Sequence, residues 1–490
     1  MNVNYSELFR ALLPETALVV GALLVLAADL VLGRTRTYGQ RLRLSIALAL
    51  VAVLAAVWGS CVAGVDGDAF RGVLVLDTLT LVTRIGVLLL AALTLGVLTS
   101  TRLRHPTEYV AIILLATCGF SVMAAAQQLL VAFLALELAS LSLYVLAGFD
   151  KTRPESAEAA LKYFLFGGMS AAFLLFGFSL IYGLTGSIEF AEIARQLRGM
   201  PANTLLVVAL VMVLAAFGFK VAAAPFHLWA PDVYQGAPAP SAALVASASK
   251  LAGFTLFGRM LWVGFAPAAG SPLPGGHETP GWLFVVVVIS AVSILLGNIA
   301  ALAQSNVRRL LAYSAIAHAG TLLLGVVAAG SVGPAPLFYY AATYGLATVG
   351  AFGVIAVVAS AGRCEALTDL AGLHRRSPLL AGCLLVFILS LAGIPPLAGF
   401  FGKFIVFAVA LRINGLAGPA GWLAVLAIAM SAVGLYYYLL ILKQALVVRG
   451  SAERSTAIPV PLGAAIALIV AAALIIALGV FPSAVLDLIQ

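Results

Sequence analysis

The chain has 490 residues, of which 63% are hydrophobic and 9% are charged. A soluble domain carries about 25% charged residues, so this chain has too little polar surface to face water. Its continuous apolar runs exclude a membrane β-barrel, whose strands alternate in polarity, and the composition also excludes a disordered chain and a secreted disulfide scaffold. The sequence therefore predicts an all-α protein that crosses the lipid bilayer many times.

Membrane spans can be counted from the apolar runs, because a helix needs about 20 residues to cross the hydrocarbon core. The first run is a poor secretory signal and is taken as an uncleaved span. Cutting at clusters of charged, proline and glycine residues predicts about fourteen spans, at approximately 12-32, 42-62, 74-99, 108-126, 129-148, 157-184, 203-230, 240-263, 281-302, 307-329, 335-360, 378-412, 419-447 and 460-485.

The formal charge of +8 is carried mostly by short loops between these runs. Cytoplasmic loops collect Lys and Arg, so the charge indicates topology and no nucleic-acid partner. The loops after odd-numbered spans hold Arg34, Arg36, Arg41, Arg43, Arg102, Arg104, Lys151, Arg153, Arg308, Arg309, Arg363, Arg375, Arg376, Arg449 and Arg454. The other side holds Arg10, Arg71, Arg195, Arg198 and the helix-end residues Arg259 and Arg412. Both termini are therefore expected on the non-cytoplasmic side.

Ionisable residues inside the spans are the most informative feature, since each Lys, Arg or Asp at a helix centre costs about 2.5–3.5 kcal/mol on insertion scales. A chain keeps such residues when they have partners or a purpose. They are Glu137, Lys162, Lys220, Lys250 and Lys403. Lys162, close to its loop, can also be explained as an anchor that reaches toward the interface.

Two histidines accompany these residues, His227 after Lys220 and His318 in a later span. Imidazole titrates near neutral pH and passes a proton either way, so it suits a relay between lysines. The alternative, a hydrogen-bonded histidine of the protein interior, stays open for both.

Two spans are expected to break beside their lysines. Pro225 and Pro231 follow Lys220, and Gly393, Pro395 and Pro396 precede Lys403. Proline removes a backbone donor, and freed carbonyls inside a membrane are tolerated where they meet protein or line a wet cavity. Broken helices beside buried charges are typical of ion-translocating folds built from inverted repeats.

The spacing supports such a repeat, because His318 follows Glu137 by 181 residues and Lys403 follows Lys220 by 183. Five spans separate the members of each pair, and an odd shift inverts the topology. The predicted organisation is an N-terminal three-helix segment at 1-107, two inverted five-helix repeats at 108-263 and 281-447, and a C-terminal helix at 460-490, with helices 7 and 12 broken.

The sequence carries no motif for nucleotide binding, nucleophilic catalysis or metal binding. No phosphate loop, dinucleotide fingerprint or nucleophile elbow is present, the histidines are scattered, and the cysteines form no C-x-x-C pair, so no metal or cofactor site is expected on this chain. The cysteines are Cys61, Cys118, Cys364 and Cys383.

Several segments resemble a known family. They are LELASLSLYVL, AALKYFLFGG, FGFKVAAAPFHLWAPDVYQGAPAPSAALVASASK and LAGIPPLAGFFGKF. They resemble the antiporter-like membrane subunits of respiratory complex I, and among these the subunit N family of bacterial NADH-quinone oxidoreductase, over nearly the whole chain. PDVYQGAPAPSAALVASASK is the most specific part, and the opening LLPETALVVGALLVLAADL is also similar to that family.

The resemblance implies a proton relay. Glu137 would pair with Lys220, and Lys250, helped by His227, would pass the proton toward the second half of the chain. Lys403 would be the exit-side site. Lys162 would modulate the Glu137 pair, and His318 would link the two halves.

The resemblance also implies a subunit of a proton-pumping translocase, without a redox site of its own, in the bacterial cytoplasmic membrane. NADH, FMN, iron–sulfur clusters and a quinone would act in other subunits, and the neighbours would be antiporter-like subunit M and the small membrane subunits K and J. The alternatives are a subunit of a cation/proton antiporter, a subunit of a related ferredoxin- or hydrogenase-linked complex, and a purely structural scaffold.

Overall fold

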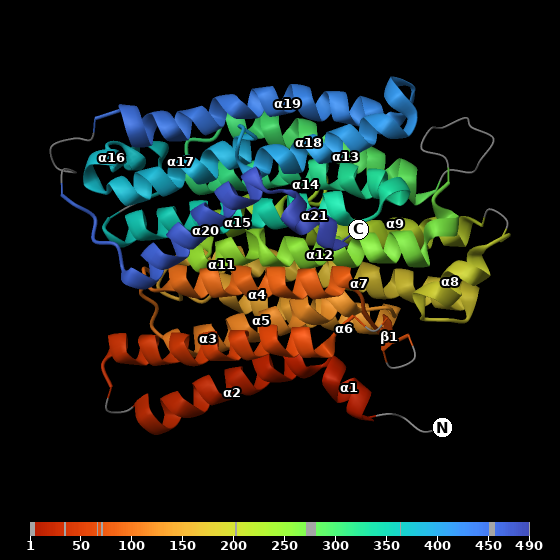
Figure 1. Ribbon diagram of the computed structural model, residues 1–490, viewed down its shortest axis with the longest axis horizontal. Helices are drawn as coiled ribbons and strands as arrows, with labels where there is room; N and C mark the ends of the chain where they lie inside the picture. Colours follow the sequence, from red (N-terminus) through yellow and green to blue (C-terminus); the bar gives the residue numbers. More distant parts are fainter. Residues whose placement is uncertain are drawn as a thin grey trace.

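The computed structural model shows a bundle of long, roughly parallel helices that lie side by side across the molecule (Figure 1). The structure describes residues 5–33, 36–65, 67–69, 72–200, 203–270, 281–362, 364–449 and 456–489. Four loop arginines singled out above lie outside the described residues; these are Arg34, Arg71, Arg363 and Arg454.

The N-terminal part forms one edge of the bundle (Figure 1). Its elements are α1 (Tyr5–Ala11), α2 (Leu13–Leu32), α3 (Tyr38–Ala63), the short antiparallel strands β1 (Gly67–Ala69) and β2 (Leu74–Leu76), and α4 (Thr78–Leu98). A buried ion pair joins α2 to α4, in which Arg84 Nη2 lies 2.8 Å from Glu15 Oε1. Removing one partner of such a pair leaves an uncompensated charge, so the pair holds α2 against α4.

The rest of the first half contains helices that surround the broken segment. They are α5 (Pro106–Ala125), α6 (Leu129–Ala147), α7 (Pro154–Thr185), α8 (Phe190–Leu197), α9 (Thr204–Lys220), α10 (Trp229–Gly236), α11 (Ala239–Ala246), α12 (Ala248–Arg259), the π-helix η2 (Met260–Gly264) and the short 3-10 turn η3 (Ala266–Ala268).

The second half of the bundle runs from α13 to α21. Its elements are α13 (Trp282–Leu302), α14 (Val307–Val332), α15 (Ala335–Ser360), η4 (Leu367–Leu370), α16 (Leu373–Arg376), α17 (Pro378–Ala392), α18 (Ala398–Asn414), η5 (Gly415–Ala417), α19 (Pro419–Leu442) with the π-helix η6 (Lys443–Val447), α20 (Leu462–Val480) and α21 (Ser483–Ile489).

The all-α polytopic fold is confirmed. Twelve helices of the described chain are long and apolar enough to cross a membrane. The two remaining predicted spans, 203-230 and 378-412, are the ones expected to break. In the first, α9 ends at Lys220 and α10 begins at Trp229, and the second is divided into α17 and α18. The inverted repeats and the four-part division stay predictions.

A third break was not expected. The span predicted at 240-263 is present as Ala239–Gly264, but within it α11 and α12 are separated at Ser247, whose backbone is non-helical with φ −117° and ψ −85°. Neither proline nor glycine stands there to signal it. This break lies three residues before Lys250, so each of the three deeply buried lysines lies at or near an interruption in its helix.

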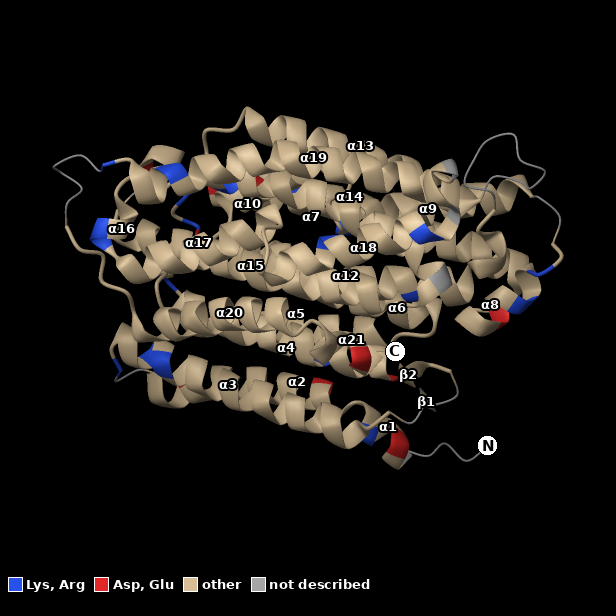
Figure 2. Cartoon of the chain, turned by 45° about the horizontal axis from the view of Figure 1, so that its top comes forward, with Lys and Arg blue, Asp and Glu red and all other residues tan. Residues whose placement is uncertain are grey.

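The loops after odd-numbered spans meet at one end of the bundle, as the charge pattern predicts. Residues from the loops near 100, 150, 238, 308, 360 and 460 line one common cavity there. Figure 2 shows Lys and Arg gathered at this end, near α16, and fewer of them at the end that carries α1 and α8.

The interior of the bundle is formed by α11, α12, α14 and α15, which are almost completely buried. Helices α2, α7, α13, α19 and α20 lie at the periphery and expose large apolar side chains. An apolar outer face is what lipid or a neighbouring membrane subunit covers. Three of the lysines singled out by the sequence, Lys220, Lys250 and Lys403, therefore lie on or beside helices that lipid does not reach.

Candidate functional site

A series of buried ionisable side chains runs through the interior of the bundle. Lys220 is 4% exposed, Lys250 is 2% exposed and Lys403 is 8% exposed. The two histidines singled out above, His227 and His318, are also buried. Keeping these groups in apolar surroundings is costly, so their partners decide what they do.

Lys220 is the last residue of α9, and its ammonium group faces α6. Its Nζ donates to Ser140 Oγ at 3.0 Å. Glu137 lies one turn before Ser140 on α6, and its Oε1 is buried without a hydrogen-bond partner among the described residues. The two charges therefore share one site, but in this structure a serine, and no direct ion pair, holds the lysine.

The break after Lys220 is stabilised by side chains of other elements. Trp229 Nε1 donates to Phe219 O at 3.1 Å, and Ser293 of α13 accepts from the backbone N–H of Ala224 at 2.8 Å. These bonds satisfy backbone groups that the end of a helix leaves free. His227 lies in the same turn with its Nδ1 buried and unpartnered among the described residues, and no described hydrogen bond joins it to Lys250.

Lys250 lies on α12 and faces α14. Its Nζ donates to Ala315 O at 2.5 Å and lies 5.4 Å from the ring centre of Tyr344, within the range of a cation–π contact. Lys220 packs against the same helix, because a Cβ built on Gly253 would lie 3.6 Å from Lys220 Cγ. Lys220 thus packs against the helix that carries Lys250, one turn away from it.

His318 lies one turn after Ala315 on α14, between two tyrosines. Its Nδ1 is 2.6 Å from Tyr340 Oη and its Nε2 is 3.0 Å from Tyr438 Oη. Tyr438 also contacts Ser314. Hydroxyl and imidazole groups both donate and accept, so this cluster can reverse the direction of its hydrogen bonds.

A small cavity joins His318 to the third lysine. It has a volume of about 20 Å³ and is lined by His318, Lys403, Asn298, Tyr437 and Tyr438, among other residues. A polar cavity of this size holds about one water molecule. One water can therefore bridge the imidazole and the ammonium group.

Lys403 stabilises the end of the helix that breaks before it. Its Nζ donates to Leu391 O at 3.0 Å and to Ala392 O at 3.1 Å, which are carbonyls of the last turn of α17. A cation is favoured there, because the C-terminus of a helix carries partial negative charge. Gly393 follows with φ +87°, and a Cβ on it would lie 3.0 Å from Lys403 Cδ, so both the backbone and the lysine require glycine.

Lys162 lies apart from this series. Its Nζ contacts Asp232 Oδ2 at 2.5 Å and Glu158 Oε1 at 2.7 Å, and Asp232 also contacts Arg309 Nη1 at 2.6 Å. The described contacts include none with Glu137. Lys162 therefore belongs to a charge cluster that joins α7, α10 and α14, and its pairing with Asp232 was not anticipated from the sequence.

Other polar partners were also missed at the sequence level. Arg84 stands inside an apolar run as conspicuously as any of the lysines, and its pairing with Glu15 explains how it is tolerated. Tyr340 and Tyr438, which flank His318, carry no signal, because aromatic residues are common in apolar helices of every kind.

Residues 126–434 match the family described as NADH:quinone oxidoreductase/Mrp antiporter, TM. The chain belongs to this family. The matched stretch contains all of the predicted site residues, from Glu137 to Lys403.

Relatives and solved structures agree with this assignment. NADH-quinone oxidoreductase subunit N 2 of Acidobacterium capsulatum is 48% identical, with 98% of each chain covered. A chain of respiratory complex I from Thermus thermophilus with bound aureothin is 34% identical, with 97% of this chain and 98% of that chain covered and a TM-score of 0.79. A chain of the Mrp complex from Dietzia has the same fold, with a TM-score of 0.81 at 22% identity over 98% of this chain and 96% of that one.

Proposed function

We propose that this chain is the N-type membrane subunit of a proton-pumping NADH-quinone oxidoreductase and carries protons along its buried polar series. The observation that carries the proposal is the continuity of that series. Lys220 packs against α12, the helix that carries Lys250. Lys250 donates to Ala315 O of α14, and His318 lies one turn further along that helix. A water-sized cavity then joins His318 to Lys403.

Each group has a role that follows from its surroundings. Glu137 supplies an unpartnered carboxylate oxygen beside the Lys220 site, and an opposite charge within about 4–6 Å stabilises the charged form of a titratable group. Movement of that carboxylate relative to Lys220 would retain or release the proton of the lysine. Lys250 and His318 would pass it onward, and Lys403 would be the last site before release.

Two of the residues have less direct roles. His227 lies in the break beside Lys220 with a free Nδ1, so we assign it to proton exchange at the first break. Lys162 is bound to Asp232 and Glu158, so its proposed influence on Glu137 would act through the position of α7 against α10.

The energy source is expected outside this chain. Redox chemistry with NADH, FMN, iron–sulfur clusters and a quinone is assigned to other subunits, and M, K and J are the proposed neighbours in the membrane. The exposed apolar faces of α6 and α7 offer surface for such contacts. The arginine-rich end of the bundle is assigned to the cytoplasm, which leaves both termini on the other side of a bacterial cytoplasmic membrane.

The test compares Lys220→Met with Lys443→Met in inverted membrane vesicles that contain matched amounts of assembled complex. Lys443 is an exposed lysine at the start of η6, so its variant removes the same charge away from the series. We expect Lys220→Met to lower NADH-driven acidification and NADH oxidation together, and Lys443→Met to change neither. Normal acidification in Lys220→Met would remove this lysine from the path and overturn the proposal.

A further inference from the structure

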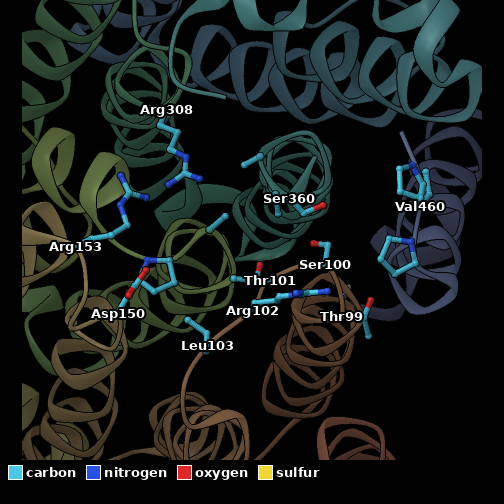
Figure 3. Close-up of a pocket in the computed structure, with 16 residues that line it drawn as sticks. Thr99, Ser100, Thr101, Arg102, Leu103, Asp150, Arg153, Arg308, Ser360 and Val460 are labelled. Atoms are coloured by element: carbon cyan, nitrogen blue, oxygen red, sulfur yellow. The ribbon is translucent and has the colours of Figure 1, made fainter. Parts of the chain in front are cut away.

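A large cavity opens between helix ends on the arginine-rich side, separate from the buried polar series. Its volume is about 750 Å³, within the range of cavities that bind small ligands. It is bounded by the end of α4, the start of α11, the end of α15 and the segment that precedes α20. Arg102, Arg153 and Arg308 line it together with Asp150, and Figure 3 shows their side chains around it.

Arg308 is the deepest of the three arginines. It is 6% exposed, and its Nη1 donates to the carbonyls of Gln235 and Ala237, each at 3.3 Å. Its Nε is buried without a hydrogen-bond partner among the described residues. Arg308 thus makes long bonds to two neutral carbonyls, and no ion pair of its guanidinium occurs among the described residues, although Glu365 lines an adjoining cavity with it.

The other two arginines are no better neutralised. Arg153 has carboxylates at 3.7 Å (Glu155) and 3.6 Å (Glu365), too far for strong bidentate pairs, and both acids are largely exposed. No ion pair of Arg102 occurs among the described residues. The carboxylate of the lining, Asp150, already accepts from the backbone and side chain of Thr152. The cavity therefore carries an excess of positive charge.

We propose that this cavity binds a phosphate group. Guanidinium groups bind phosphate by paired, charge-assisted hydrogen bonds, and three of them line this one polar cavity, which favours an anionic ligand over a neutral one. The N-terminus of α11, at Pro238 and Ala239, also opens onto the cavity and carries partial positive charge. The inference is independent of the proton path.

The phosphate can come from a membrane lipid or from solution, and the surroundings favour a lipid. The segment 459–461 lines the cavity and leads into α20, whose outer face exposes Leu462, Ile466 and Ile469. The cavity thus lies where the apolar surface of the bundle ends, at the expected level of lipid headgroups. Basic pockets between membrane helices on the cytoplasmic side bind anionic headgroups.

The experiment measures equilibrium binding to the intact, delipidated complex in detergent, with radiolabelled phosphatidylglycerol in one arm and radiolabelled orthophosphate in the other. The test variant is Arg102→Gln combined with Arg153→Gln. The matched control is Arg104→Gln, which removes an exposed arginine from the same loop as Arg102 but outside the cavity lining. Arg308 is kept, because its bonds to Gln235 and Ala237 also hold the backbone.

We expect saturable binding of phosphatidylglycerol that weakens at least tenfold in the double variant and less than twofold in Arg104→Gln, with weak binding of orthophosphate. Tight binding of orthophosphate that is lost in the double variant would support a phosphate site in this cavity, with a soluble ligand in place of a lipid. Absence of saturable binding in both arms, or an equal loss in the control, would overturn the proposal. The melting temperature of the double variant is also measured without ligand. If it is unchanged, weaker binding reflects loss of the site and not unfolding.

Discussion

Gly393→Ala is the smallest change that perturbs the Lys403 site. The residue has φ +87° and ψ 46°, and alanine in this left-handed region costs about 1–2 kcal/mol. The added Cβ would also lie 3.0 Å from Lys403 Cδ and 3.4 Å from its Nζ. The lysine must therefore shift away from the carbonyls of Leu391 and Ala392.

The expected loss follows from the two bonds that Lys403 makes. A hydrogen bond to a charged group contributes about 1.5–3 kcal/mol, and each 1.36 kcal/mol changes a rate tenfold. If one of the two bonds no longer forms, proton transfer through Lys403 slows at least about tenfold. Acidification by inverted vesicles and NADH oxidation, measured at matched assembly, should fall in parallel.

Gly186→Ala is the control that separates backbone strain from the effect on the lysine. Gly186 ends α7 in the same left-handed conformation, with φ 68°, and a Cβ there would meet no described atom within 4 Å. Both variants should lower the thermal stability of the complex by a similar amount, but only Gly393→Ala should slow pumping. Equal pumping in the two variants would refute the role given to the position of Lys403.

Three further predictions concern partners of the charged groups. Ser140→Ala removes the hydroxyl that holds Lys220 and should lower coupled activity about tenfold, whereas Ser142→Ala on the same helix, measured in the same vesicles, should not. Asp232→Asn leaves two cations of its cluster without their shared carboxylate, and limited proteolysis should show looser packing of α10. Coupled activity should fall as well, because the proposed influence of Lys162 on Glu137 acts through the position of α7 against α10. Burial alone would raise the pKa of Asp77, but hydrogen bonds from its arginine partner on α12 outweigh burial, and the pKa is lowered. This carboxylate therefore stabilises the fold above its unfolded pKa, and the contribution is lost as the pH falls through the lower folded pKa. Melting curves at pH 7 and at about pH 2.5, below the unfolded pKa of an aspartate, should differ less in Asp77→Asn than in the parent.

Much of the fold follows from composition and proline placement. Continuous apolar runs predict the helices, and the prolines beside Lys220 and Lys403 predict the two breaks, because proline cannot supply the backbone donor that an unbroken helix needs. The break at Ser247 could not be predicted in this way. Ser247 is buried, and neither proline nor glycine stands beside it to mark the interruption in the sequence.

The site residues were easier to identify than their partners. A charged residue in an apolar run is conspicuous wherever it points, so Glu137, Lys220 and Lys403 could be singled out by type alone. What each one contacts depends on helix rotation and on which helices are neighbours. The pairing of Lys162 with Asp232 and the bonds from Lys403 to backbone carbonyls required the tertiary structure.

The two broken helices place their lysines in different electrostatic surroundings. Lys220 is held by a side-chain hydroxyl beside a carboxylate with a free oxygen, and both groups belong to α6, so a small movement of that helix changes the field at the lysine. Lys403 is held by backbone carbonyls within its own broken segment, which cannot titrate and have little freedom to move. In the proposed relay, control of Lys403 would come from the side of His318, through the cavity that the two residues share. In the proposed relay, this asymmetry places the input at the carboxylate end and the response at the histidine end.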